Sequence, residues 1–139
     1  MKERRKKQLS GKELANAIEE ACDGLIYVSE TDAPIELLFV PNHDSLKLFE
    51  GVQAALNEKK NIKEEPASKF FDRLTAEREW HGPREKAKVK RFVKLEKLLK
   101  EHLADLTLFR AGRVRLEVVA AGFDSEGNVA GIRTKAVET

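Results

Sequence analysis

The side chains that could do chemistry in this sequence are three histidines, one cysteine and many carboxylates. His43, His81 and His102 lie far apart and share no zinc-ligand spacing with Cys22. Segment 124–128 begins like a calcium loop, but its glycine comes too early and no glutamate closes it, so it predicts a hairpin turn. The sequence has no GxGxxG motif, no complete phosphate loop and no Gly-x-Ser-x-Gly elbow. We therefore expect a non-enzymatic protein without a metal or cofactor.

Three other features are unusual for a plain domain. Glu30 and Asp32 lie in a polar loop that ends at Pro34, and a stiff loop loses little entropy on binding a partner, although the spacing alone favours an ordinary acidic loop. Trp80 is the only tryptophan and is surrounded by charges, which is compatible with a binding hot spot or with a side chain folded back over the core. A strand running to Thr139 would fix the terminal carboxylate, whereas fraying is the usual behaviour of a chain end.

Composition indicates one charged domain with a basic start. The chain has 139 residues, 41% of them hydrophobic, which suffices for a single core. Residues 1–7 carry a net charge of +4, so the remainder carries −2 although the whole chain is at +2. We predict a basic disordered tail at 1–9 and a folded domain at 10–139. A basic tail can also contact nucleic acid.

No segment predicts a membrane or secretory protein. No apolar run approaches the roughly 20 residues of a membrane helix, and no apolar stretch follows the basic start as in a signal peptide. The single cysteine, Cys22, excludes an internal disulfide and lies on the apolar face of a predicted helix. We expect a core thiol in a protein of the reducing cytoplasm.

The first two predicted helices are indicated by caps and apolar periodicity. Ser10, three residues before a glutamate, fits a capping box, and Gly24 can adopt the left-handed conformation that ends a helix. A second helix is expected to run from a cap at Asp44 or Ser45 to about residue 59.

Two more helices are opened by prolines, because proline suits the first helical turn. The helix after Pro66 carries Phe70 and Phe71. The helix that begins at Pro83 runs to about Ala104. Its predicted inward stripe consists of Val89, Phe92, Val93, Leu95, Leu99 and Leu103.

Strands are predicted mainly near the C-terminus. Gly112 separates the first two C-terminal runs, and the turn at 124–128 joins the second to the third. Residues 29–34 are expected to form a loop. The expected extended runs are 25–28, 35–40, 62–63, 107–110, 114–121 and 129–137. Helices mixed with antiparallel strands favour helices packed on a sheet.

Four stretches of this chain resemble the nuclease A inhibitor family. The most specific one is the C-terminal stretch, because the family ends almost identically, including the final threonine. The resemblance runs from about Leu14 to the last residue and is weak between about residues 41 and 62. The matching stretches are 22–30 with Pro34 and Glu36, Phe70-Phe71 with Glu79-Trp80, 90–95, and 130–139.

The resemblance implies a single-domain α/β/α sandwich with a largely antiparallel C-terminal sheet. It also implies one-to-one binding of a sugar-non-specific nuclease that uses a histidine base and one divalent metal. Glu30 matches the family glutamate that approaches this metal. Trp80 and Thr139 match the family's tryptophan and terminal threonine contacts. Arg78 and Glu79 match positions at the same edge.

Two alternatives stand beside a monomeric nuclease inhibitor. A nucleic-acid-binding module would use residues 2–7, and its affinity would fall steeply with salt, although the acidic remainder of the chain should repel phosphate. An enzyme would use carboxylates such as Glu30 and Asp32, and it would need a pocket whose groups have perturbed pKa values. We rank the inhibitor first and the enzyme last.

Overall fold

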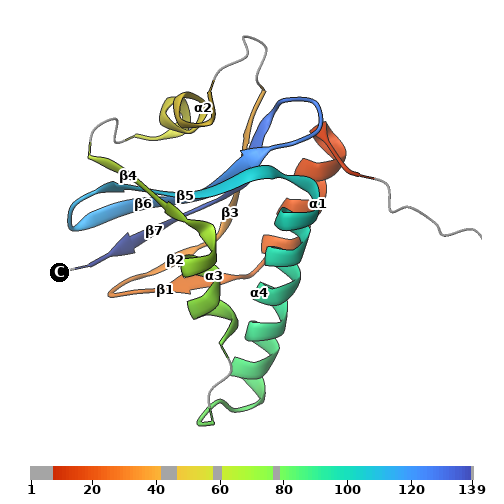
Figure 1. The fold of residues 1–139 in the computed structure, drawn as a ribbon. Helices are drawn as coiled ribbons and strands as arrows, with labels where there is room; N and C mark the ends of the chain where they lie inside the picture. Colours follow the sequence, from red (N-terminus) through yellow and green to blue (C-terminus); the bar gives the residue numbers. More distant parts are fainter. Residues whose placement is uncertain (1–7, 42–46, 58–60, 77–78, 139) are drawn as a thin grey trace, which may run out of the picture.

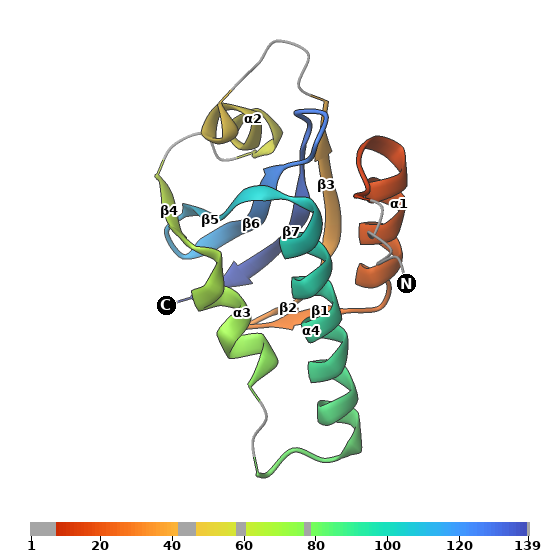
Figure 2. The ribbon, with the colours of Figure 1, turned by 45° about the vertical axis from the view of Figure 1, so that its right-hand side comes forward.

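The protein is a three-layer α/β/α sandwich, which confirms the expected fold class. The computed structural model describes residues 8–41, 47–57, 61–76 and 79–138. In this part of the chain, a five-stranded antiparallel sheet has the order β3-β7-β6-β5-β4. One face is covered by α1 (Gly11–Cys22), α3 (Ala67–Thr75) and α4 (Pro83–His102), and the other by α2 (Leu48–Ala55) (Figure 1, Figure 2).

The sheet includes strands from the middle of the chain as well as from its C-terminal end. A separate antiparallel hairpin, β1 with β2, lies at the lower end of the sheet in Figure 1. Its turn therefore falls beside the end of β7. The strands are β1 (Ile26–Val28), β2 (Asp32–Pro34), β3 (Glu36–Val40), β4 (Ile62–Pro66), β5 (Ala104–Gly112), β6 (Arg115–Phe123) and β7 (Val129–Val137).

The alternation of side chains along each strand divides the core in two. On β6, Val118 joins the larger cluster under α1, α3 and α4, whereas Val119 joins the smaller cluster under α2. The smaller layer is thin because α2 lies close to the sheet. A side-chain carbon added to Gly51 would come within 2.7 Å of a Val129 methyl group.

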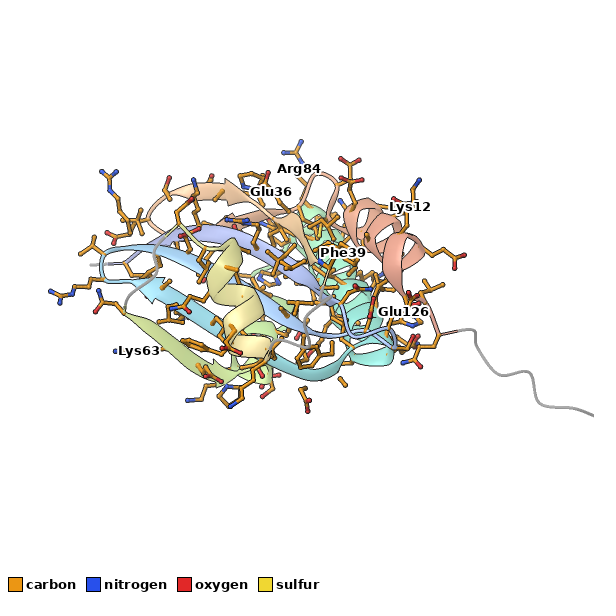
Figure 3. All side chains as sticks on the ribbon, turned by 90° about the horizontal axis from the view of Figure 1, so that it is seen from above. Lys12, Glu36, Phe39, Lys63, Arg84 and Glu126 are labelled. Carbon is orange, nitrogen blue, oxygen red and sulfur yellow. The ribbon has the colours of Figure 1, made fainter. Side chains whose placement is uncertain are left out.

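The start of α1 is held by the β6–β7 turn. Ser10 precedes the helix but makes no side-chain cap hydrogen bond, so the predicted capping box is wrong. The Ser10 hydroxyl instead contacts Glu126, and the Gly11 amide donates to Asp124 Oδ2 at 2.9 Å. Figure 3 shows Glu126 beside the start of α1, where Lys12 is labelled. A residue distant in sequence thus replaces the local cap.

Several predicted boundaries differ from the structure. Helix α2 begins only at Leu48, and the predicted caps Asp44 and Ser45 lie outside the described residues. Part of the loop predicted at 29–34 is strand β2, because it pairs with β1. Pro66 ends β4 and precedes α3 instead of lying inside it.

The predicted core stripe of α4 is correct except at Val93, which is 45% exposed. Two predictions at the C-terminal end of α1 are confirmed. Gly24 has a left-handed φ of 77° just after the helix, and Cys22 is buried.

Candidate functional site

The β1–β2 turn is docked on the end of β7. The Ser29 hydroxyl accepts a hydrogen bond from the Val137 amide at 3.1 Å, and the Glu30 amide donates to the Val137 carbonyl at 3.3 Å. Within the turn, the Thr31 carbonyl accepts from the Ser29 amide at 2.9 Å and from the Ser29 hydroxyl at 3.0 Å. These contacts fix the backbone that carries the exposed Glu30 next to the end of the chain.

Strand pairing adds to the contacts that hold this turn. On the β2 side, the Thr134 hydroxyl of β7 donates to the Pro34 carbonyl at 2.9 Å. Asp32, the other acidic residue of the segment, pairs with Val28 across the hairpin and is exposed. The acidic segment is therefore a hairpin turn held by strand pairing and hydrogen bonds, and not the loop that was expected at 29–34.

The last described residue, Glu138, is anchored at both its backbone and its side chain. Its amide donates to the Val114 carbonyl at 2.9 Å. Its carboxylate accepts from the Arg110 guanidinium, with Nη1 lying 3.1 Å from both carboxylate oxygens and Nη2 3.3 Å from one. The end of β7 and the Glu30 turn therefore form one connected surface.

This surface also exposes apolar side chains. Val28 is 59% exposed on β1, and Val114 is 49% exposed in the β5–β6 turn, next to Glu138. A hollow of about 520 Å³ opens between the hairpin, α3 and the chain end. It is lined by Tyr27, Val28, Ser29, Glu30, Arg73, Val137 and Glu138. Carboxylates beside exposed valines are the kind of surface that a protein partner can bury.

Trp80 lies in the segment between α3 and α4, away from the Glu30 turn. This segment forms the lower tip of the molecule in both ribbon views (Figure 1, Figure 2). Trp80 is 76% exposed, which decides between the two interpretations of the sequence in favour of an exposed ring. Its ring packs edge-on against His81, with the centroids 4.4 Å apart.

The five predicted site residues therefore do not all lie in one described site. It places Glu30 at the end of β7 and places Glu79 and Trp80 together in an exposed segment at the tip. Arg78 and Thr139 lie outside the described residues.

Of the other groups that sequence analysis considered for chemistry, Cys22 is buried in the core, whereas His43 lies outside the described residues. Burial raises the pKa of the Cys22 thiol to about 12, although nearby Arg91 acts in the opposite direction. Such a thiol is not a nucleophile at neutral pH. Among the described residues, no group of three or more His, Cys, Asp or Glu side chains is arranged to hold a metal ion. The described helices are too short or too polar to span a lipid bilayer.

A family model described as "Nuclease A inhibitor-like protein" matches residues 12–139. The chain belongs to this nuclease A inhibitor-like family. The match starts one residue inside α1 and includes every strand, so it covers the complete sandwich. The comparison with curated proteins gives no match.

Sequence analysis missed several residues of this nuclease A inhibitor-like surface. Ser29 gave no signal, because its hydroxyl acts on Val137, a residue distant in sequence. Val28 and Arg110 did give one. Val28 alternates with the buried Tyr27, which indicates an outward side chain, and Arg110 is the only basic residue of β5, where it follows the apolar Leu108 and Phe109. A charge at such a position indicates a partner on the same face of the sheet.

Proposed function

We propose that this protein inhibits a metal-dependent, sugar-non-specific nuclease by occupying its active site one to one. The observation that carries the proposal is the docking of the exposed Glu30 turn onto the end of the chain, in a member of the nuclease A inhibitor-like family. A nuclease active site holds phosphate with cations and a metal. A carboxylate on a fixed turn can take the place of that phosphate with little loss of entropy.

The proposed contacts divide between two parts of the molecule. Glu30 faces the nuclease's metal, and Thr139 adds its hydroxyl beside it. Trp80 contributes apolar burial from the tip, with Arg78 and Glu79 at the same edge. The exposed Val28 and Val114 support a protein partner at the first part, because they surround the carboxylates with apolar surface. An inhibitor of this kind protects its host from within the cytoplasm, which we propose as its location.

The test is a titration against a magnesium-dependent nuclease that cleaves both DNA and RNA. We expect inhibition that is stoichiometric with the enzyme and equal on the two substrates. Glu30→Ala should weaken binding by about 30-fold, or about 2 kcal/mol, as at an interface hot spot. Trp80→Ala should weaken it by a similar factor. Glu20→Ala on the exposed face of α1 is the matched control and should change nothing.

Two controls separate inhibition of the enzyme from binding of the substrate. With the nucleic acid kept well below its KM for the nuclease, inhibition must follow the amount of nuclease and must not depend on the amount of nucleic acid, and it must not depend on residues 1–7. Dependence on either would favour the alternative function, a nucleic-acid-binding module. Failure to inhibit any nuclease of this class, including one from the same organism, would overturn the proposal.

A further inference from the structure

Arg110 is a charged residue in the apolar strand β5. Its side chain is 17% exposed and lies on the same face of the sheet as Leu108, which belongs to the larger core cluster. Arg110 lines hollows on both sides of it. One lies between β1 and α3, with a volume of about 520 Å³, and the other lies beside β4, with a volume of about 680 Å³. The guanidinium is therefore at a solvent boundary close to the Glu30 turn.

Two carboxylates from different strands converge on this guanidinium. Glu138 accepts from it through both carboxylate oxygens, and Glu65 of β4 lies 3.5 Å from Nε. The side chains of Glu65 and Glu138 are 34% and 42% exposed, so water screens the pairing and its contribution to overall stability is modest. The two-oxygen geometry matters more for position than for stability, because it fixes the orientation of both groups.

The contact crosses strand β6. Arg110 belongs to β5, and Glu138 follows β7, while β6 lies between these strands. At the chain end, Glu138 binds the Val114 carbonyl and Val137 binds both Ser29 and Glu30. A continuous series of contacts therefore leads from the Arg110 side chain through Glu138 and Val137 to the backbone of Glu30.

Loss of the Arg110 guanidinium would do more than remove the contact with Glu138. Glu65 and Glu138 would then face each other without the cation between them, and their like charges would repel. Glu138 would be the one to move, because it lies beyond the last residue of β7, whereas Glu65 belongs to β4, which pairs with β5 over five residues.

We propose that Arg110 is a positioning residue, which fixes Glu138 and through it the Glu30 turn in the geometry that a nuclease recognises. The inference rests on the proposed inhibitor function for its consequence in binding. The positioning itself is a property of the free protein, and it is testable without a nuclease.

The first experiment measures amide hydrogen exchange in the free protein. In Arg110→Met, exchange at Glu30, Val137 and Glu138 should accelerate by up to about fivefold, the upper range for one partly exposed ion pair. Amides in the centre of β6 should keep their wild-type protection. Unchanged exchange at Val137 and Glu138 would overturn the proposal.

Matched variants separate the effect of positioning Glu138 from the effect of removing a positive charge. Glu138→Gln removes the partner from the exposed side without disturbing the sheet, so it tests the same contact if Arg110→Met folds poorly. Lys63, which Figure 3 labels, pairs with Arg110 in the β4–β5 register. Lys63→Met therefore removes a neighbouring cation and should leave the three amides unchanged. Arg110→Lys keeps the charge but not the two-oxygen geometry, and should restore protection only in part.

The second experiment measures the inhibition constant of the same variants. Arg110→Met and Glu138→Gln should each weaken inhibition by about fivefold to tenfold, and neither effect should add fully to that of Glu30→Ala, because all three act on one connected surface. Full additivity would mean that Arg110 does not act through the Glu30 turn, which would overturn the proposal. If the wild-type protein inhibits no nuclease, the proposed function fails, whereas the exchange experiment still decides whether Arg110 positions the turn.

Discussion

Asp124 is the residue that holds the β6–β7 turn and the start of α1 together. Its Oδ1 accepts from the amides of Glu126 and Asn128 at 2.9 Å, and its Oδ2 accepts from the Gly11 amide at 2.9 Å and from the Asn128 side chain at 3.0 Å. Burial alone would raise the pKa of this carboxyl, but the four hydrogen bonds together lower it below its ordinary value of 3.8.

This lowered pKa predicts a specific dependence of stability on pH. The stabilisation should be complete well above pH 3.8 and should be lost as the pH falls through the lower pKa of the folded state, because the unfolded chain binds the proton first. At neutral pH, Asp124→Asn should lower the free energy of unfolding by about 2 kcal/mol, because charge-assisted hydrogen bonds are lost. Denaturant unfolding of both proteins measures the difference. If the difference in unfolding free energy between the wild-type protein and Asp124→Asn does not become smaller in acid, this account is contradicted.

At the scale of elements, α1 depends on residues of other elements at both ends. Its start is held by Asp124, as described above. At its end, Arg91 of α4 donates through Nη2 to the carbonyls of Ala21 and Asp23, at 3.1 Å and 2.6 Å. The last carbonyls of a helix have no partner within the helix and carry its negative pole, so a guanidinium stabilises them.

Removal of this guanidinium should therefore loosen α1 from its C-terminal end. We expect Arg91→Met to lower the free energy of unfolding by about 1 kcal/mol, the usual range for a cation at a helix C-terminus. Lys90→Met, one position earlier on the same helix, is the control and should have little effect, because the contacts described here at the end of α1 come from the Arg91 side chain. Thermal unfolding of the two variants makes the comparison. Equal effects would mean that Arg91 acts only as a surface charge.

The same distinction between local and distant contacts explains which elements could be predicted from the sequence. The long helix from Pro83 and the C-terminal strands were predicted well, because periodicity and turn residues are local signals. The cap of α1 and strand β2 were not. Ser10 depends on Glu126, and Asp32–Pro34 depends on β1, so neither conformation is encoded in its own segment.

For the candidate site too, the sequence indicates some residues, whereas the contacts that position them appear only in the folded structure. Glu30, Glu79 and Trp80 came from the family resemblance and are all exposed, as binding residues must be. The contacts that position Glu30 come from Ser29 and Val137, which only the folded sheet brings together. The pairing of Arg110 with Glu138 likewise needs three strands in a defined order, which composition and periodicity do not specify.

At the scale of the whole molecule, charge is divided between the first residues and the rest. Residues 1–7 carry +4 and the remainder carries −2. In the proposed function, the partner surface holds phosphate with cations and therefore attracts the acidic remainder and repels the basic start. The two effects oppose each other during diffusional encounter, where charge affects the association rate more than the final contacts do.

Removal of residues 1–7 should therefore speed association with the nuclease. We expect the association rate constant to rise by about threefold at low salt. This increase should vanish near 1 M salt, where the Debye screening length is only about 3 Å. Stopped-flow measurement at two ionic strengths tests this. A variant with the five basic residues replaced by glutamine has the same length as the wild-type chain. Its association rate should equal that of the truncated protein, because the charge of these residues and not their bulk slows association. Slower association after truncation would instead assign these residues a direct contact with the partner or its nucleic acid.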